Sequence, residues 1–221
     1  MTLYFLSGLG ADRRVFGRLQ LPGPYRIVHL DWIEPLPRES LEHYALRLSA
    51  GINTNEPFAL IGLSFGGMLA VEIARVLRPT CLILISSAVT CGELPSSYRT
   101  ATARRLAGVA PLWLFKIQHA VLEWFFGAGD QDSRTLLRSI FRDSNAAFNK
   151  WAVGAILSWR NSSIPHSPLY RIHGDKDRIL PIGNMKINHV VKGGGHLAVF
   201  SNADVVSPLI VQCLEESTPR A

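Results

Sequence analysis

The sequence contains few cysteines and no long apolar run. Its three cysteines, Cys81, Cys91 and Cys213, are dispersed and show no C-x-x-C or metal-ligand spacing, so they indicate neither a disulfide framework nor a metal site. No stretch approaches the ~20 apolar residues that a membrane-spanning helix requires. The apolar run at the start is too short for a signal peptide, and its arginines follow it instead of preceding it. These features predict a cytoplasmic protein with free thiols and no membrane span.

Charged residues are also few, at 18% of the chain, and basic residues outnumber acidic ones to give a net charge of +6. Apart from the pairs Arg13-Arg14 and Arg104-Arg105, the basic residues are scattered. Nucleic-acid binding would need a basic face with interleaved aromatic residues or a known motif. We therefore expect a solvated basic surface and no nucleic-acid partner, while a mild preference for anionic substrates stays open.

The chain shows no low-complexity segment and no internal repeat. Hydrophobic residues make up 48% of the 221 residues, which is enough to bury a substantial core. The composition is that of a compact, enzyme-like protein and argues against disorder. We predict one domain over residues 1–221, whose oligomeric state the sequence does not reveal.

Apolar segments with strand character alternate with helical segments along most of the chain. The predicted strands are residues 2–6, 25–30, 58–61, 80–86, 168–175 and a last strand and turn over 186–196; the predicted helices are 13–20, 41–50, 68–77 and 198–214. Each strand is a nearly continuous apolar run, which is typical of a parallel sheet covered on both faces. The pattern predicts an α/β protein.

Residues 90–163 break this alternation. They contain no strand-like run, and instead show helical stretches with large apolar residues at 106–126 and 146–159. We therefore expect a core of residues 1–89 and 164–221 with a helical insertion between its two parts. Four of the five tryptophans lie in the insertion: Trp113, Trp124, Trp151 and Trp159. They either pack the insertion onto the core or line a pocket beneath a cap.

The stretch GLSFGG connects the third predicted strand directly to the helix that follows it. So sharp a reversal needs residues without a Cβ on either side of its apex, and Gly62, Gly66 and Gly67 supply them. Ser64 occupies the apex. The following helix points its free N–H groups and the positive end of its dipole toward this serine. The motif G-x-S-x-G in this context predicts a nucleophile elbow.

A serine nucleophile needs a general base, and the base needs a carboxylate to fix its tautomer. Loops at the carboxyl ends of later strands would converge on the elbow. After the last strand the sequence GGGH supplies His196, our predicted base. The loop HGDKDRILP supplies Asp175 and Asp177, which spacing alone does not separate. His173, inside a strand, is predicted to be structural.

Three blocks together resemble the α/β-hydrolase superfamily: FLSGLG, GLSFGG and the pair HGDKDRILP and GGGH. Each block is weak alone, but they stand in the family's order across nearly the whole chain. In that family the acid loop follows H-G-x-x-D with a proline shortly after, so the resemblance implies a Ser64, Asp177 and His196 triad with Pro181 as the proline. It also implies an oxyanion hole formed by the backbone N–H groups of Leu9 and Phe65.

The sequence departs from the family in three places. Ser7 stands where many relatives have a histidine, so the bracing of that loop must come from elsewhere. The chain starts at what resembles the family's third strand, which implies a reduced, mostly parallel sheet of about six strands. Asp177 and His196 are 19 positions apart, which leaves room for at most a short helix between them.

The leading hypothesis is a serine hydrolase that cleaves a small ester or related acyl compound, with no cofactor and no metal. The same triad could instead cleave a C–C bond, a thioester or an amide, or transfer an acyl group. A non-catalytic ligand-binding relative is a third possibility. A dehalogenase or epoxide hydrolase is disfavoured, since those members of the family carry Asp at the position of Ser64.

Overall fold

A six-stranded parallel sheet forms the centre of the molecule. The structure is a computed structural model that describes residues 1–111 and 120–217. The strands are β1 (Thr2–Leu6), β2 (Arg26–His29), β3 (Phe58–Leu63), β4 (Cys81–Ile85), β5 (Leu169–Gly174) and β6 (His189–Val191). Their order is β2-β1-β3-β4-β5-β6, and every neighbouring pair is parallel. The predicted α/β fold with about six strands is confirmed.

Both faces of the sheet are buried because successive strand residues point to opposite sides. In β1, Tyr4 and Leu6 belong to one hydrophobic cluster, and Leu3 and Phe5 belong to the other. The inner strands β1, β3 and β4 are therefore continuous, buried runs that are almost wholly apolar, as expected for a parallel sheet between two layers of helices. The edge strand β2 is partly exposed, and β5 carries Arg171 and His173.

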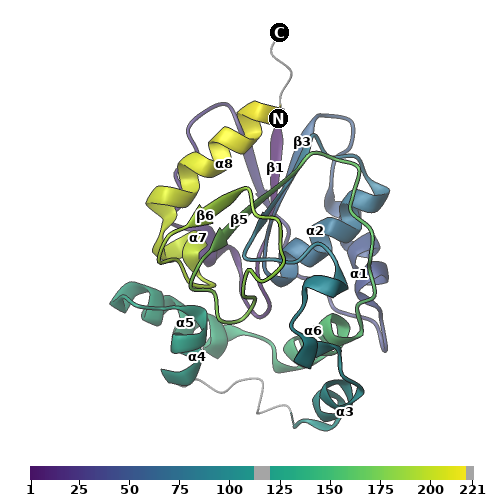
Figure 1. The fold of residues 1–221 in the computed structure, drawn as a ribbon. Coiled ribbons are helices and arrows are strands. Elements are labelled where there is room, and N and C mark those ends of the chain that lie inside the picture. Colours follow the sequence, from purple (N-terminus) through teal and green to yellow (C-terminus); the bar gives the residue numbers. More distant parts are fainter. Residues whose placement is uncertain (112–119, 218–221) are drawn as a thin grey trace.

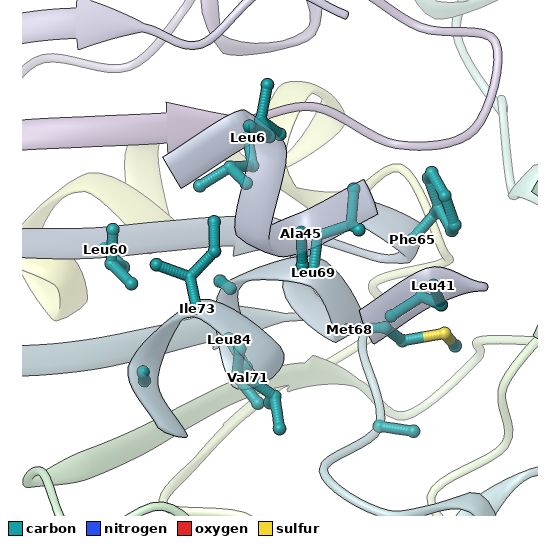
Figure 2. Close-up of a cluster of buried hydrophobic side chains, with 14 of the residues drawn as sticks. Leu6, Leu41, Ala45, Leu60, Phe65, Met68, Leu69, Val71, Ile73 and Leu84 are labelled. Atoms are coloured by element: carbon teal, nitrogen blue, oxygen red, sulfur yellow. The ribbon is translucent and has the colours of Figure 1, made fainter. Parts of the chain in front are cut away.

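Helices cover the two faces (Figure 1). On one face lie α1 (Leu41–Leu48) and α2 (Phe65–Val76); on the other lie a short 3-10 helix, η1 (Arg13–Phe16), with α7 (Ala198–Ser201) and α8 (Ala203–Ser217). Figure 2 shows Leu69 and Ile73 of α2 among strand side chains such as Leu60 and Leu84. Ser40 caps α1 by accepting a hydrogen bond from the N–H of His43.

The segment between β4 and β5 is helical in the parts that the structure describes. It contains η3 (Cys91–Glu93), η4 (Ser96–Arg99), α3 (Ala101–Val109), α4 (Ala120–Phe126), α5 (Gln131–Asp143) and α6 (Ala146–Ser158). In Figure 1 helices α3–α6 gather beyond the carboxyl ends of the strands. The predicted helical stretch over 106–126 is interrupted, because α3 ends at Val109 just before Pro111. Residues 112–119, and Trp113 with them, lie outside the described residues.

Other differences concern element ends. The predicted helix over 13–20 is a single 3-10 turn, because Gly17 caps it and prolines follow. The closing helix is divided at Asn202 into α7 and α8. β6 covers only three residues, and residues 175–188 contain no helix. Among the helices that the structure describes, none has the length and apolar character needed to cross a membrane.

Candidate active site

Ser64 lies at the sharp turn between β3 and α2. Its backbone angles are φ 53° and ψ −119°, a conformation that costs a non-glycine residue energy. The turn is held by a hydrogen bond from the N–H of Ser64 to the carbonyl oxygen of Ile85 in β4, at 2.9 Å. The predicted strand-turn-helix is therefore present, and it exposes the serine hydroxyl at the carboxyl edge of the sheet.

The glycines around Ser64 allow backbone segments to meet without side chains between them. A Cβ on Gly62 would lie 2.4 Å from the Cα of Gly67, and a Cβ on Gly66 would lie 2.1 Å from the carbonyl oxygen of Ser7. Both distances are shorter than any real Cβ contact. The elbow thus requires glycine at these two positions for steric reasons.

The loops after β5 and β6 bring Asp177 and His196 to the serine. The Nε2 atom of His196 lies 2.8 Å from the Oγ of Ser64, and its Nδ1 lies 2.7 Å from the Oδ2 of Asp177. His196 and Asp177 are both buried. Because the carboxylate can only accept, Nδ1 carries the proton and Nε2 is left free to accept from the serine hydroxyl. The three predicted side chains therefore form one continuous hydrogen-bonded chain.

The environment of Asp177 keeps its carboxylate charged. Its burial favours the protonated form, but the charge of His196 and hydrogen bonds from His173, His196 and the N–H of Leu180 outweigh that effect. The pKa of Asp177 is therefore well below its usual value. His173 also donates to the carbonyl oxygen of Leu180, at 2.7 Å, so it ties both ends of the acid loop, in agreement with its predicted structural role.

The loop after β1 passes close to the serine. A Cβ on Gly8 would lie 3.6 Å from the Cβ of Ser64. Within the described parts of the chain, the backbone N–H groups of Leu9 and Phe65 have no hydrogen-bond acceptor. These two donors are free at the edge where Ser64 lies.

A cavity of about 440 Å³ opens onto Ser64 and His196. Its walls come from the loop after β1 and from helices α4, α5 and α6. The sheet-forming part of the chain and the helical segment between β4 and β5 therefore both border it. The described lining residues are Gly8, Leu9, Ala11, Val15, Leu63, Ser64, Tyr98, Leu122, Phe125, Phe126, Leu137, Ile140, Phe141, Val153, Ile156, Leu157, Ile179, His196 and Leu197. All but three of these have apolar side chains or none.

Comparison with known families matches residues 3–209 to the alpha/beta hydrolase family. The chain belongs to this family. A poly(3-hydroxyalkanoate) depolymerase from Ectopseudomonas oleovorans is 26% identical over 183 residues, which are 73% of this chain and 62% of the relative. The chain therefore spans less than two thirds of the length of that relative.

Solved structures share the fold. A thermophilic esterase from Thermogutta terrifontis superposes with a TM-score of 0.74 at 18% identity, covering 98% of this chain and 90% of the esterase. An enol-lactonase from Burkholderia xenovorans gives a TM-score of 0.75 at 16% identity, covering 97% of this chain and 91% of the lactonase. These likenesses confirm the predicted α/β-hydrolase fold.

Asp175, the other carboxylate in the loop after β5 of this hydrolase, has partners other than His196. Its Oδ1 accepts a hydrogen bond from the N–H of Gly193, at 2.7 Å, and Lys192 lies within ion-pair distance. Asp175 therefore stabilises the turn that follows β6.

Two side chains that the sequence does not mark, Ser87 and Trp32, and Ser7, which it does, support the hydrolase's site. Ser87 donates to the carbonyl oxygen of Ser64 at 2.6 Å. Trp32 donates to the carbonyl oxygen of Ala11 at 2.8 Å, and Ser7 donates to the same oxygen at 2.9 Å. The bracing that the sequence left unassigned in the loop after β1 thus comes from Ser7 and Trp32 together. No motif marks either Trp32 or Ser87.

The described tryptophans of the helical segment do not line the cavity. Trp159 is buried and donates to Glu72 of α2, and Trp151 packs on Tyr44 of α1. Trp124 is 57% exposed. Of the two interpretations, packing onto the core holds for Trp151 and Trp159, while Tyr98 and three phenylalanines, Phe125, Phe126 and Phe141, line the cavity.

Metal ligands do not gather near the site. Among residues 1–111 and 120–217, no three histidine, cysteine, aspartate or glutamate side chains come close enough to hold a metal ion. The described polar groups at the cavity are those of Ser64, His196 and Tyr98.

Proposed function

We propose that the protein is a serine hydrolase that cleaves a small ester through an acyl-enzyme on Ser64. The observation that carries the proposal is the hydrogen-bonded chain from Ser64 through His196 to Asp177, with contacts of 2.8 and 2.7 Å. The first contact is within the distance at which a positioned base takes a proton from a nucleophile, and the second allows Asp177 to orient that base. This series of hydrogen bonds ends at Ser64, which borders a cavity large enough for a small molecule.

In the first step, the Oγ of Ser64 attacks the ester carbonyl carbon while its proton passes to Nε2 of His196. The carbonyl oxygen becomes an oxyanion, for which the free N–H groups of Leu9 and Phe65 are the proposed donors. Collapse of this intermediate breaks the bond to the alcohol oxygen, which leaves with the proton from His196. An acyl group then remains on Ser64.

In the second step, water attacks the acyl-enzyme and passes a proton to His196. The second tetrahedral intermediate collapses, the acid leaves, and Ser64 takes the proton back. Asp177 stays ionised throughout and stabilises the imidazolium that forms twice in the cycle. Its low pKa supports this role, since a carboxylate that took up the proton would leave His196 without its partner.

Names of relatives favour an ester over the other bonds that such a triad can cleave. The structural relatives include an esterase and an enol-lactonase, and the sequence relative depolymerises a poly(3-hydroxyalkanoate), which is a polyester. We further propose that the helical segment, about residues 90–163, acts as a cap on a core of residues 1–89 and 164–221. The contribution of α4, α5 and α6 to the cavity walls supports this division.

A fluorophosphonate probe tests the nucleophile. The folded wild-type protein should form a covalent adduct on Ser64, identified by peptide mass spectrometry, and should hydrolyse p-nitrophenyl butyrate. Ser64→Ala should form no adduct, and its kcat should fall by a factor of about 10⁴ or more. Circular dichroism checks that the variant is folded. Wild-type-like turnover by Ser64→Ala would refute the proposal.

A further inference from the structure

We propose that the substrate of this hydrolase is an ester of an uncharged, apolar acyl chain of medium length, bound in the cavity between Ser64 and helices α4–α6. This inference rests on the proposed function and names its substrate class. Two observations support it: the described lining of the cavity is almost wholly apolar, and Arg178 and Arg14 interact with groups other than the lining.

The described lining of the cavity is apolar almost throughout. Beyond Ser64 and His196, the one polar side chain is that of Tyr98, whose hydroxyl lies 3.4 Å from the carbonyl oxygen of Ile179. No aspartate, glutamate, lysine or arginine is among the described lining residues. A substrate that fills this space must therefore be stabilised by burial of apolar surface.

Two described arginines that are adjacent in sequence to residues of the site or of the cavity lining form interactions with other groups. Arg178 directly follows Asp177, but its guanidinium lies 4.1 Å from the ring centre of Trp124 and donates to the carbonyl oxygen of Trp124. Arg14 pairs with Asp12 and Asp143.

A carboxylate on the acyl chain would consequently lose its hydration in the cavity without gaining a described partner, which is costly. Although the protein has a net charge of +6, no lysine or arginine is among the described lining residues. The preference for anionic substrates that the composition left open is disfavoured at this site.

The size of the cavity sets the chain length. A volume of about 440 Å³ corresponds to on the order of 15 groups the size of a water molecule. An eight-carbon acyl chain fits within it and leaves space for the leaving group. Each methylene that passes from water into such a lining should raise kcat/KM by about fourfold.

Val153 of α6 offers a way to shorten the cavity. It lines the cavity and is half-buried, yet it belongs to none of the hydrophobic clusters of the core. A larger side chain at this position should therefore occupy substrate space without displacing core residues. Ala147 lies on the same helix, is exposed and is not part of the cavity lining, so it provides a matched control.

The test compares three p-nitrophenyl esters with the full-length protein: the butyrate, the octanoate and the mono-ester of suberic acid, which also has eight carbons but ends in a carboxylate. We expect kcat/KM for the octanoate to exceed that for the butyrate by on the order of 100-fold. The suberate ester should be at least tenfold poorer than the octanoate. In Val153→Phe the octanoate-to-butyrate ratio should fall at least tenfold, and in Ala147→Phe it should not change.

A preference for the butyrate or for the suberate ester would overturn the inference, as would an unchanged ratio in Val153→Phe. These failures differ from a failure of the proposed function. If only the substrate class is wrong, the protein still hydrolyses some ester and still forms the Ser64 adduct. If the proposed function is wrong, the protein hydrolyses none of the esters and forms no adduct.

Discussion

The elbow around Ser64 and the helices between β4 and β5 both border the same cavity, but they tolerate change very differently. At the elbow, a Cβ on Gly62 or Gly66 would meet backbone atoms closer than 3 Å. In the helical segment, a Cβ on Gly129 or Gly154 would meet nothing within 4 Å, whereas one on Gly127 would lie 2.7 Å from the Cα of Gly195. Backbone contacts therefore fix the position of Ser64, while most of the helical part of the cavity wall is formed by side-chain packing.

The largest expected difference is between the effects on kcat of replacing Asp177 and Asp175, the two aspartates of the loop after β5. Asp177→Asn should lower kcat for p-nitrophenyl butyrate by about 10³ to 10⁴-fold, because an amide at this position favours the wrong tautomer of His196. Asp175→Asn should leave kcat within about threefold, because the described partners of the Asp175 side chain are the N–H of Gly193 and the ammonium of Lys192. Steady-state kinetics of both variants decides the matter, and a larger loss at Asp175 would reverse the assignment.

Replacing glycine by alanine should change the stability of the protein in opposite directions in the elbow and in the helical segment. Gly66→Ala should destabilise the protein by about 4 kcal/mol or more, or prevent folding, since the new Cβ would lie 2.1 Å from the carbonyl oxygen of Ser7. Gly154→Ala, in the middle of α6, should increase the free energy of unfolding by about 0.5–1 kcal/mol. Urea titrations measure both values. Equal effects of Gly66→Ala and Gly154→Ala on the free energy of unfolding would contradict this difference between the elbow and the helical segment.

The helical segment depends on a polar contact for part of its attachment. Trp159→Phe removes the 2.7 Å hydrogen bond to Glu72, a buried carboxylate that keeps only Arg75 as a side-chain partner. The variant should be about 1–3 kcal/mol less stable. Trp124→Phe, at an exposed position stacked with Arg178, should lose at most about 1 kcal/mol. Thermal unfolding of the two variants tests this order.

Backbone strain at Ser64 should be measurable as well. With φ at 53°, Ser64→Gly should be about 1 kcal/mol more stable than Ser64→Ala, although both lack the nucleophile. Elsewhere, replacing alanine by glycine usually destabilises. Denaturant titration of the two inactive variants compares them directly, and a less stable glycine variant would show that the turn is unstrained.

The sequence predicts the elbow well because its determinants are local. Gly62, Ser64 and Gly66 define a turn whose geometry follows from steric limits alone, and the parallel order of the strands brings the loop residues Asp177 and His196 to the same edge. The choice between the two aspartates required the family's pattern, because spacing does not specify which carboxylate a loop turns inward.

Contacts between distant segments were not predictable in the same way. The hydrogen bonds of Trp32 to Ala11 and of Ser87 to Ser64 join loops whose mutual position depends on the assembled sheet. In the helical segment, large apolar residues recur on several helical faces, so the pattern does not distinguish Phe126, which lines the cavity, from Trp159, which packs against α2.

The central claim is that the elbow places Ser64 to form an acyl-enzyme. Rapid quenching of the wild-type protein with p-nitrophenyl butyrate, followed by peptide mass spectrometry, tests it most directly. The account predicts a butyryl group on the peptide that contains Ser64, formed together with a burst of p-nitrophenol. Steady hydrolysis with no acylated peptide and no burst, or acylation at another residue that supports turnover, would contradict it.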